Sequence, residues 1–241
     1  MRSKILAAMI VAAAASAASA DTVQMKFVGT DEGRSVKVTI GSDTFNCFSG
    51  QLLHQFTAGN GVATQLNGLT KVTYCTDLTQ VVTSSYDTYT VAPIGSLPQS
   101  AGWPAMGAGR AQAVYNLYAA GAGQQNLVTG NDDFASAFQI ALWEIVYDYN
   151  PAIVGGYSLT AGNFKVKNTD GTALSSAIST KVGQLFALLG TIAPQTGLLG
   201  LTNDCSQDQI VQVNTIPLPT AAYAGLGGLV LAGIARKRLR R

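Results

Sequence analysis

Residues 132–147 read DDFASAFQIALWEIVY, and this stretch decides how the chain is organised. Its apolar residues recur at spacings of three and four, which predicts a helix that Asp132 or Asp133 caps and that runs to about Tyr147. Gln139 lies in the middle of this otherwise apolar segment. A buried carboxamide without hydrogen-bond partners is costly, so Gln139 needs a structural or a chemical reason.

Strand patterns lie on both sides of this helix. Alternating apolar residues, or clusters of β-branched and aromatic ones, predict strands at residues 23–28, 35–40, 44–48, 72–76, 86–91 and 209–213. Two more helices are expected at residues 111–120 and 175–189, a hairpin turn at Asp31-Glu32-Gly33, and a loop or linker at 194–204. The order of strands, helices and a final strand predicts an α+β fold. Its β-rich sandwich or barrel body packs against a helical subdomain of about three helices.

The N-terminal residues 1–20 have the layout of a secretory signal peptide. Two basic residues precede an apolar run at residues 5–15, which is too short to span a membrane comfortably. Ala18 and Ala20 then form an A-x-A cleavage site. We therefore expect export, with a working body at residues 21–215.

In the C-terminal residues 216–241, Pro217-Leu218-Pro219 precedes an apolar, Gly- and Ala-rich segment, and a basic cluster ends the chain. This layout resembles the PEP-CTERM sorting tails that exosortase-type enzymes process in Gram-negative bacteria. Leu218 stands where the family usually has Glu. The resemblance implies an exosortase-type partner and membrane contact through the C-terminal segment. A plain membrane anchor is the alternative, with the basic end kept in the cytoplasm.

The charge of the body differs from that of the whole chain. The chain has 15 Lys and Arg against 13 Asp and Glu, but two of the basic residues lie in the leader and five in the tail. The remaining eight stand against all 13 acidic residues, which gives the body a net charge of −5. Its basic residues are scattered singly, so no nucleic-acid partner is expected.

Cys75 offers a chemical reason for Gln139. It ends the predicted strand in the segment Thr73-Tyr74-Cys75-Thr76-Asp77. A cysteine thiolate can attack a glutamine carboxamide, expel ammonia and leave an internal thioester. The simpler alternative is that Gln139 hydrogen-bonds a backbone group while its apolar neighbours pack the core.

The two segments together resemble the thioester domains of bacterial surface adhesins. Those domains have an aromatic residue before the cysteine, as in Tyr74-Cys75, and later an apolar-Gln-x-x-apolar-Trp pattern, as in Phe138-Gln139-x-x-Leu142-Trp143. The resemblance implies a side-chain bond between Cys75 and Gln139. It also implies that Tyr74, Phe138, Leu142 and Trp143 shape the site and keep it dry.

The cysteine count is odd for an exported chain. Cys47, Cys75 and Cys205 leave one thiol free if the other two pair. A Cys47–Cys205 disulfide would leave Cys75 for Gln139, whereas a Cys47–Cys75 disulfide would exclude the thioester. Disulfides are expected in an exported protein, and the sequence leaves both pairings open.

Other chemistries have little support in the sequence. A cysteine protease or transglutaminase needs a histidine to activate the thiolate, and His54, the only one, lies in an ordinary apolar segment. No metal site is predicted, because one His and three dispersed Cys have no ligand spacing. Residues 204–208 lack the Gly and Glu of a calcium loop. No cofactor is expected.

The sequence therefore predicts an exported cell-surface or matrix protein. Its thioester would tether it covalently, once per molecule, to an amine or hydroxyl on a surface or matrix polymer, so it is not an enzyme in the usual sense. An extracellular-polysaccharide or biofilm setting fits the two signals. Two alternatives stay open, a non-covalent structural protein of the envelope or matrix, and a carbohydrate-binding module that uses Trp103 and Tyr115.

Overall fold

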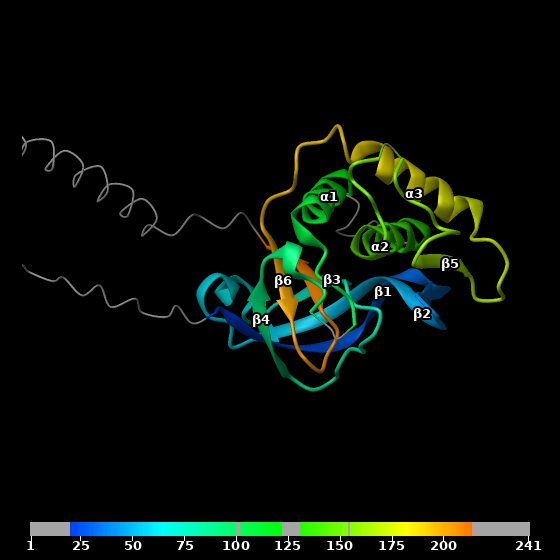
Figure 1. The fold of residues 1–241 in the computed structure, drawn as a ribbon. Coiled ribbons are helices and arrows are strands. Elements are labelled where there is room, and N and C mark those ends of the chain that lie inside the picture. The colour runs from blue at the N-terminus through cyan, green and yellow to red at the C-terminus, as the bar shows by residue number, and fades with distance from the viewer. Residues whose placement is uncertain (1–19, 100–101, 122–130, 154, 214–241) are drawn as a thin grey trace, which may run out of the picture.

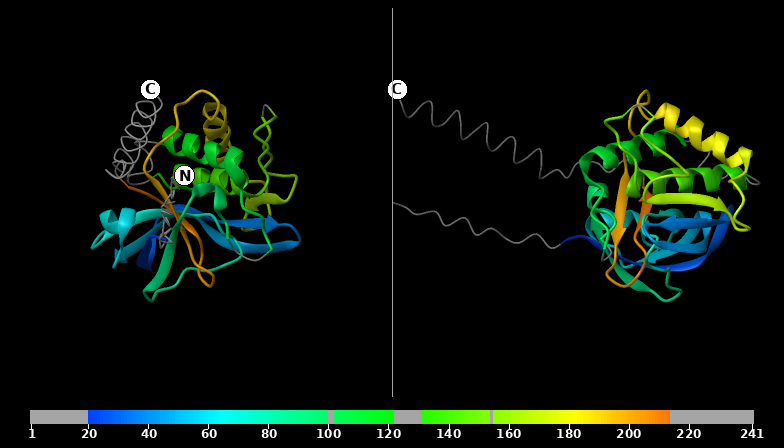
Figure 2. Two further views of the ribbon diagram at one scale, coloured as in Figure 1. Left: turned by 60° about the vertical axis from the view of Figure 1, so that its left-hand side comes forward. Right: turned by 45° about the vertical axis from the view of Figure 1, so that its right-hand side comes forward.

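Six strands close into an antiparallel β-barrel in the computed structural model, which describes residues 20–99, 102–121, 131–153 and 155–213. The ring runs β1-β2-β3-β7-β6-β4 and returns to β1. A seventh strand, β5, pairs with β1 outside the ring. Figures 1 and 2 show the helices gathered on one side of this sheet. The predicted α+β class, with its β-rich body and helical part, is confirmed.

The elements follow the predicted order, with two strands added. The strands are β1 (Thr22–Ile40), β2 (Asp43–Thr57), β3 (Thr70–Cys75), β4 (Asp87–Ala92), β5 (Phe164–Asn168), β6 (Leu198–Thr202) and β7 (Gln209–Gln212). The helices are α1 (Gly107–Ala120), α2 (Asp132–Tyr147) and α3 (Ser176–Leu188), with short 3-10 turns η1 (Gly61–Leu66) and η2 (Ile94–Ser96).

The first two predicted strands form one long strand, so the predicted turn at Asp31-Glu32-Gly33 is wrong. That segment lies within β1, where the register against β2 shifts and the extra residues are absorbed as irregularities. The real hairpin turn is Gly41-Ser42, because Ile40 pairs with Asp43. Gly41 has a φ of 57°, which the first position of a tight hairpin turn favours.

The predicted loop at residues 194–204 contains β6, which pairs with β4 and β7. Its central residue is Gly200, where an added Cβ would lie 2.6 Å from Leu97 Cδ1 and 2.7 Å from the Ala92 carbonyl oxygen. Glycine therefore allows the β4 end of the barrel to approach closely.

The two layers have separate apolar cores. One core lies inside the barrel and is built from residues such as Met25, Phe56 and Leu201. The larger core joins the helices to the sheet and includes Phe138, Leu142 and Trp143 of α2. Fourteen of the sixteen α2 residues, 134 to 147, are buried, so this helix is enclosed on nearly all sides. Its position fixes where Gln139 meets the sheet.

The cap of α2 differs from the prediction. Asn131, not Asp132 or Asp133, is the N-cap, and its side chain accepts a hydrogen bond from the Phe134 backbone N–H at 3.3 Å. The two aspartates lie in the first turn and bind Arg34 of β1 at 3.2 and 3.0 Å. They therefore tie the helix start to the long hairpin.

The predicted signal peptide at residues 1–20 and sorting tail at 216–241 lie outside the described residues, apart from residue 20. Both segments therefore stay predictions from the sequence. Within the described ranges, no helix has both the length and the apolar character that a membrane crossing requires.

Candidate functional site

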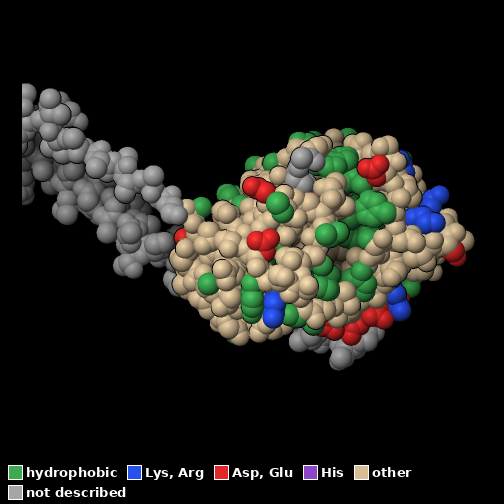
Figure 3. All heavy atoms as spheres, turned by 90° about the horizontal axis from the view of Figure 1, so that it is seen from below, with side chains coloured by type: hydrophobic (Ala, Val, Ile, Leu, Met, Phe, Trp, Pro, Cys, Tyr) green, Lys and Arg blue, Asp and Glu red, His purple; other side chains and the backbone are tan. Residues whose placement is uncertain are grey.

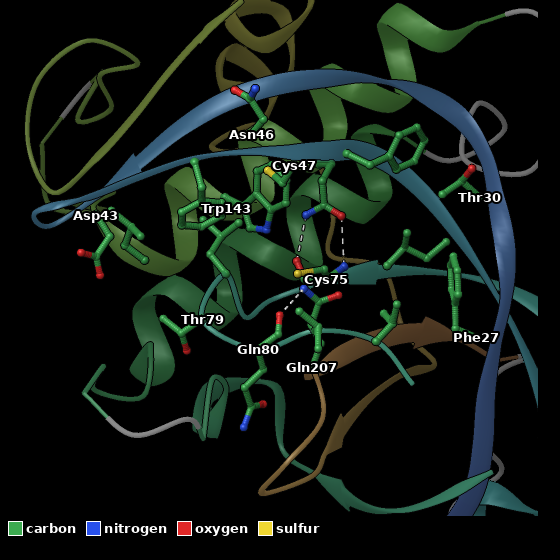
Figure 4. A pocket seen from close by; sticks show the side chains of 18 residues that line it. Phe27, Thr30, Asp43, Asn46, Cys47, Cys75, Thr79, Gln80, Trp143 and Gln207 are labelled. Carbon is green, nitrogen blue, oxygen red and sulfur yellow. Dashed lines mark hydrogen bonds between the residues drawn. The ribbon is translucent and has the colours of Figure 1, made fainter. Parts of the chain in front are cut away.

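Cys75 and Gln139 meet where the end of β3 touches the middle of α2. The Cys75 backbone N–H donates to Gln139 Oε1 at 3.0 Å, and Gln139 Nε2 donates to the Cys75 carbonyl oxygen at 2.8 Å. Both residues are buried, with 2% and 1% of their surface exposed. The carboxamide is thus held against the backbone of Cys75 by both of its polar atoms (Figure 4).

The Cys75 thiol is fully enclosed. Its Sγ donates to the Asp77 carbonyl oxygen at 3.0 Å. Burial raises the pKa of the thiol well above its ordinary value, while the Trp143 indole N–H beside it lowers that pKa. Trp143 Nε1 has no hydrogen-bond partner of regular geometry, so the indole N–H faces the sulfur without a well-aligned bond (Figure 4). At neutral pH the thiol is therefore protonated.

Tyr147 holds the loop that follows Cys75. Its hydroxyl donates to the Thr76 carbonyl oxygen at 3.1 Å and accepts from the Leu78 backbone N–H at 2.8 Å. Gln139, Trp143 and Tyr147 are spaced by four on α2 and share one face of it. The four-residue spacing was the signal that could have identified Tyr147 from the sequence.

Gln207 holds the same loop from the opposite side. Its Nε2 donates to the carbonyl oxygens of Asp77 at 2.8 Å and Gln80 at 3.1 Å. The Asp77 carbonyl oxygen therefore accepts from both the Cys75 thiol and Gln207. Sequence analysis did not single out Gln207, because this contact joins segments that lie 130 residues apart.

The residues predicted to shape the site divide into two groups. Trp143 lines the cavity that contains Cys75 and Gln139. Phe138 packs instead against Tyr74 and Tyr118, with ring centroids at 4.5 and 5.1 Å. Leu142 is completely buried in the same core. Tyr74, Phe138 and Leu142 thus support the two elements that carry the pair, and Trp143 is the one beside the sulfur.

A cavity of about 630 Å³ opens onto the pair. It lies between β1, β2, the loop after β3 and α2, and Cys75, Gln139 and Trp143 form part of its lining. On the face seen in Figure 3, hydrophobic side chains gather around a hollow. A molecule from solution can therefore reach the neighbourhood of two otherwise buried side chains.

Neither of the two disulfide pairings that the sequence leaves open, Cys47–Cys205 and Cys47–Cys75, is formed. All three cysteines are free thiols, and Cys205 is exposed in the loop between β6 and β7. Cys47 is half-buried in β2 and lines the same cavity as Cys75. Cys205 lines a different pocket from Cys47, so the fold does not bring these two thiols to the same site.

His54 plays a structural part in β2. Its Nδ1 lies 2.8 Å from Thr73 Oγ1, and Thr73 donates in turn to Gln209 Oε1 at 3.0 Å. Burial lowers the pKa of His54 to about 4, so the imidazole is neutral. His54 does not line the cavity that contains Cys75 and Gln139.

The remaining candidates lie elsewhere. Trp103 packs edge-on against Tyr147 at 5.0 Å, and Tyr115 lines a separate pocket on α1. Asp208 accepts backbone N–H bonds from Gln99 and Asn203. Among the described residues, no group of three or more His, Cys, Asp or Glu is placed to hold a metal ion.

Residues 72–183 match the thioester domain family. The match begins in β3, contains both Cys75 and Gln139, and ends within α3. It leaves out the β1–β2 hairpin and the last two strands. Comparisons with curated proteins and with solved structures give no match. The family match supports a thioester-forming domain, and within the matched segment the structure brings Gln139 into hydrogen-bonding contact with Cys75.

Proposed function

We propose that Cys75 and Gln139 form an internal thioester, which tethers an exported protein covalently to an amine or hydroxyl on a surface or matrix polymer. One observation carries the proposal. The Gln139 carboxamide lies against the backbone of Cys75 through two hydrogen bonds, inside the segment that matches the thioester domain family.

The bond would form by attack of Cys75 Sγ on Gln139 Cδ. The C–S bond forms, the C–N bond breaks, and the thiol proton leaves with the amide nitrogen as ammonia. The Cys75 backbone N–H already donates to Gln139 Oε1, the atom on which negative charge develops during the attack. A fixed donor at that position stabilises the charged intermediate.

Burial would also protect the thioester after it has formed. A thioester hydrolyses when water reaches it, and both Cys75 and Gln139 are almost fully enclosed by the core. Trp143 lies beside the sulfur and lines the same cavity. The arrangement thus supports a bond that persists until a nucleophile enters the cavity.

Opening the thioester completes the tether. An amine or hydroxyl attacks Gln139 Cδ, the C–S bond breaks, and the proton of the nucleophile passes to the Cys75 sulfur. The product is an amide or ester on Gln139 and a free thiol. No cofactor takes part, and each molecule reacts once, so the protein acts as a covalent tether rather than as an enzyme.

The cellular setting rests on the two ends of the chain. The leader and the sorting tail support export, exosortase-type processing and membrane contact through the C-terminal segment, at the cell surface or in the extracellular matrix. A biofilm or polysaccharide matrix provides polymers that carry both amines and hydroxyls.

The test is the intact mass of protein purified without amines. We expect a deficit of one ammonia in the wild type that is absent from Cys75→Ala. Methylamine should add to Gln139 and bring the mass to that of the intact chain plus one CH2 unit, because a methyl group replaces one hydrogen of the carboxamide. A full mass in the wild type, with no methylamine uptake, would remove the thioester.

A non-covalent structural protein is the second candidate. The observation in its favour is that the two hydrogen bonds of Gln139 give both polar atoms of the buried carboxamide a partner, as in an ordinary core glutamine. The same mass measurement separates the two, because a purely structural Gln139 keeps its ammonia.

A further inference from the structure

The cavity beside Cys75 contains the place that an incoming nucleophile must occupy. Cys75, Gln139 and Trp143 belong to its lining, so the cavity reaches the two residues of the proposed thioester. Its volume of about 630 Å³ lies within the range of cavities that hold small organic groups. The chemistry of the remaining walls therefore decides which nucleophiles enter.

Apolar side chains make up most of those walls. Three phenylalanine rings come from the β1–β2 hairpin, and aliphatic side chains come from β1, β2 and the loop after β3. The apolar set is Phe27, Phe45, Phe48, Ile40, Leu52, Leu78, Val81 and Val82. Figure 4 shows the cavity between the hairpin, the loop and α2.

Charge is nearly absent from the lining. Among the described residues that line the cavity, Asp43 is the one carboxylate, and neither Lys nor Arg occurs. Asp43 is exposed at the outer end of the hairpin. Burial raises the pKa of the Cys47 thiol to about 12, so this group is neutral and does not act as a base. The polar remainder consists of Thr, Asn and Gln side chains.

Moving a cation from water into this cavity costs a large desolvation free energy. No described lining residue provides a buried negative charge that would compensate for the lost water. An amine must therefore arrive as the free base. A weakly basic amine, such as an α-amino group with a pKa of about 7.7–8.0, supplies far more free base at neutral pH than a lysine at about 10.4.

We propose, on the basis of the thioester function above, that this cavity selects a weakly basic, otherwise uncharged amine attached to an aromatic or branched apolar group. The reacting nitrogen reaches Gln139, while the apolar group packs against Phe45 and Phe48. Both rings are only half-buried by the protein itself, so a ligand can cover the rest.

Three amines that react through the same type of nitrogen test the selection. Phenylalanine amide, glycine amide and arginine amide are compared at equal concentration of free base, and adducts on Gln139 are counted by mass spectrometry. We expect phenylalanine amide to react about tenfold faster than glycine amide, since burying one aromatic side chain provides at least that factor. Arginine amide should react more slowly than glycine amide.

Variants of the wall separate the cavity from general reactivity. Phe48→Ala and Phe45→Ala should each lower the ratio of the reaction rate of phenylalanine amide to that of glycine amide towards one. Val28→Ala is the control, because Val28 is also an apolar β1–β2 residue, 48% exposed, but does not line the cavity. Loss of ammonia from each variant confirms that it has folded and formed its thioester before the amines are added.

A binding measurement tests the cavity without the chemistry. N-acetylphenylalanine amide and N-acetylarginine amide have no free α-amine, and their binding to the full-length Cys75→Ala variant can be followed by NMR. Tighter binding of the phenylalanine compound, lost in Cys75→Ala/Phe48→Ala, supports the cavity preference even if the wild type forms no thioester. Equal binding and equal reaction rates for the two side chains would overturn it, while leaving the thioester intact.

Discussion

Gln139 and Tyr147 lie two helical turns apart on α2 and hold successive parts of one backbone segment. Gln139 binds the N–H and carbonyl of Cys75, and Tyr147 binds the carbonyl of Thr76 and the N–H of Leu78. Trp143, midway between them, faces the sulfur. One helix face therefore holds Cys75 and the loop that follows it.

Replacing Gln139 by leucine should both abolish the thioester and destabilise the fold. The change leaves the buried N–H and carbonyl of Cys75 without partners, and we expect a loss of about 2–4 kcal/mol in the free energy of unfolding. Urea denaturation measures it. Gln112→Leu on the exposed face of α1 is the control and should change stability by less than about 0.5 kcal/mol. Equal effects of the two changes would contradict the role of Gln139.

Tyr147→Phe should slow formation of the thioester. The variant keeps the ring, which packs against Trp103, but removes the hydroxyl that joins Thr76 to Leu78. We expect a loss of about 1–3 kcal/mol in stability and a slower release of ammonia after refolding, measured by mass against time. Tyr86→Phe, at an exposed tyrosine, should leave both quantities unchanged. Unaltered ammonia release in Tyr147→Phe would show that the loop needs no such support.

Trp143→Phe should make Cys75 less reactive. The indole N–H lowers the pKa of the thiol, so its removal raises that pKa further and disfavours the thiolate that departs when the thioester opens. We expect slower methylamine uptake than in the wild type, with a shift to higher pH in the alkylation profile of the unreacted thiol. Trp103→Phe removes the other tryptophan and should leave the alkylation profile in place.

Glu144 should make stability fall as pH rises from about 4.5 to 7. Burial raises its pKa to about 7, Asp148 adds to the effect, and the Ser158 backbone N–H and Arg110 oppose it. Because the folded state then binds the proton more tightly than the unfolded state, the free energy of unfolding decreases between the two pKa values and levels off above about pH 7.

Glu144→Gln tests this dependence. Glutamine keeps an acceptor for the Ser158 N–H, which lies 2.9 Å from Glu144 Oε1, but cannot ionise. In the wild type, Glu144 should lower the free energy of unfolding by up to about 3 kcal/mol as the pH rises. The variant should lack this part of the decrease. Asp208, whose pKa burial raises to about 6, stays in both proteins and sets the residual slope. Parallel curves of stability against pH for the two proteins would rule out Glu144 as the source.

Local patterns were sufficient for much of the fold. The helix at 132–147, the strand ending at Cys75 and the α+β class all follow from periodicity and composition, because each depends on residues close in sequence. The prediction of a turn at residues 31–33 was wrong because it, too, relied only on residues close in sequence. Acidic and glycine residues favour a turn locally, but β1 continues there because β2 pairs with it on both sides of the irregularity.

The sequence by itself determined that Cys75 ends a strand and that Gln139 lies in an apolar helix. Only the tertiary structure decided that the carboxamide meets the Cys75 backbone, that Gln207 and Tyr147 hold the loop, and that Cys47 and Cys205 remain apart. The physical reason is that these contacts join segments from 64 to 130 residues apart. Barrel closure and packing of α2 against the sheet set those contacts, and no local spacing encodes them.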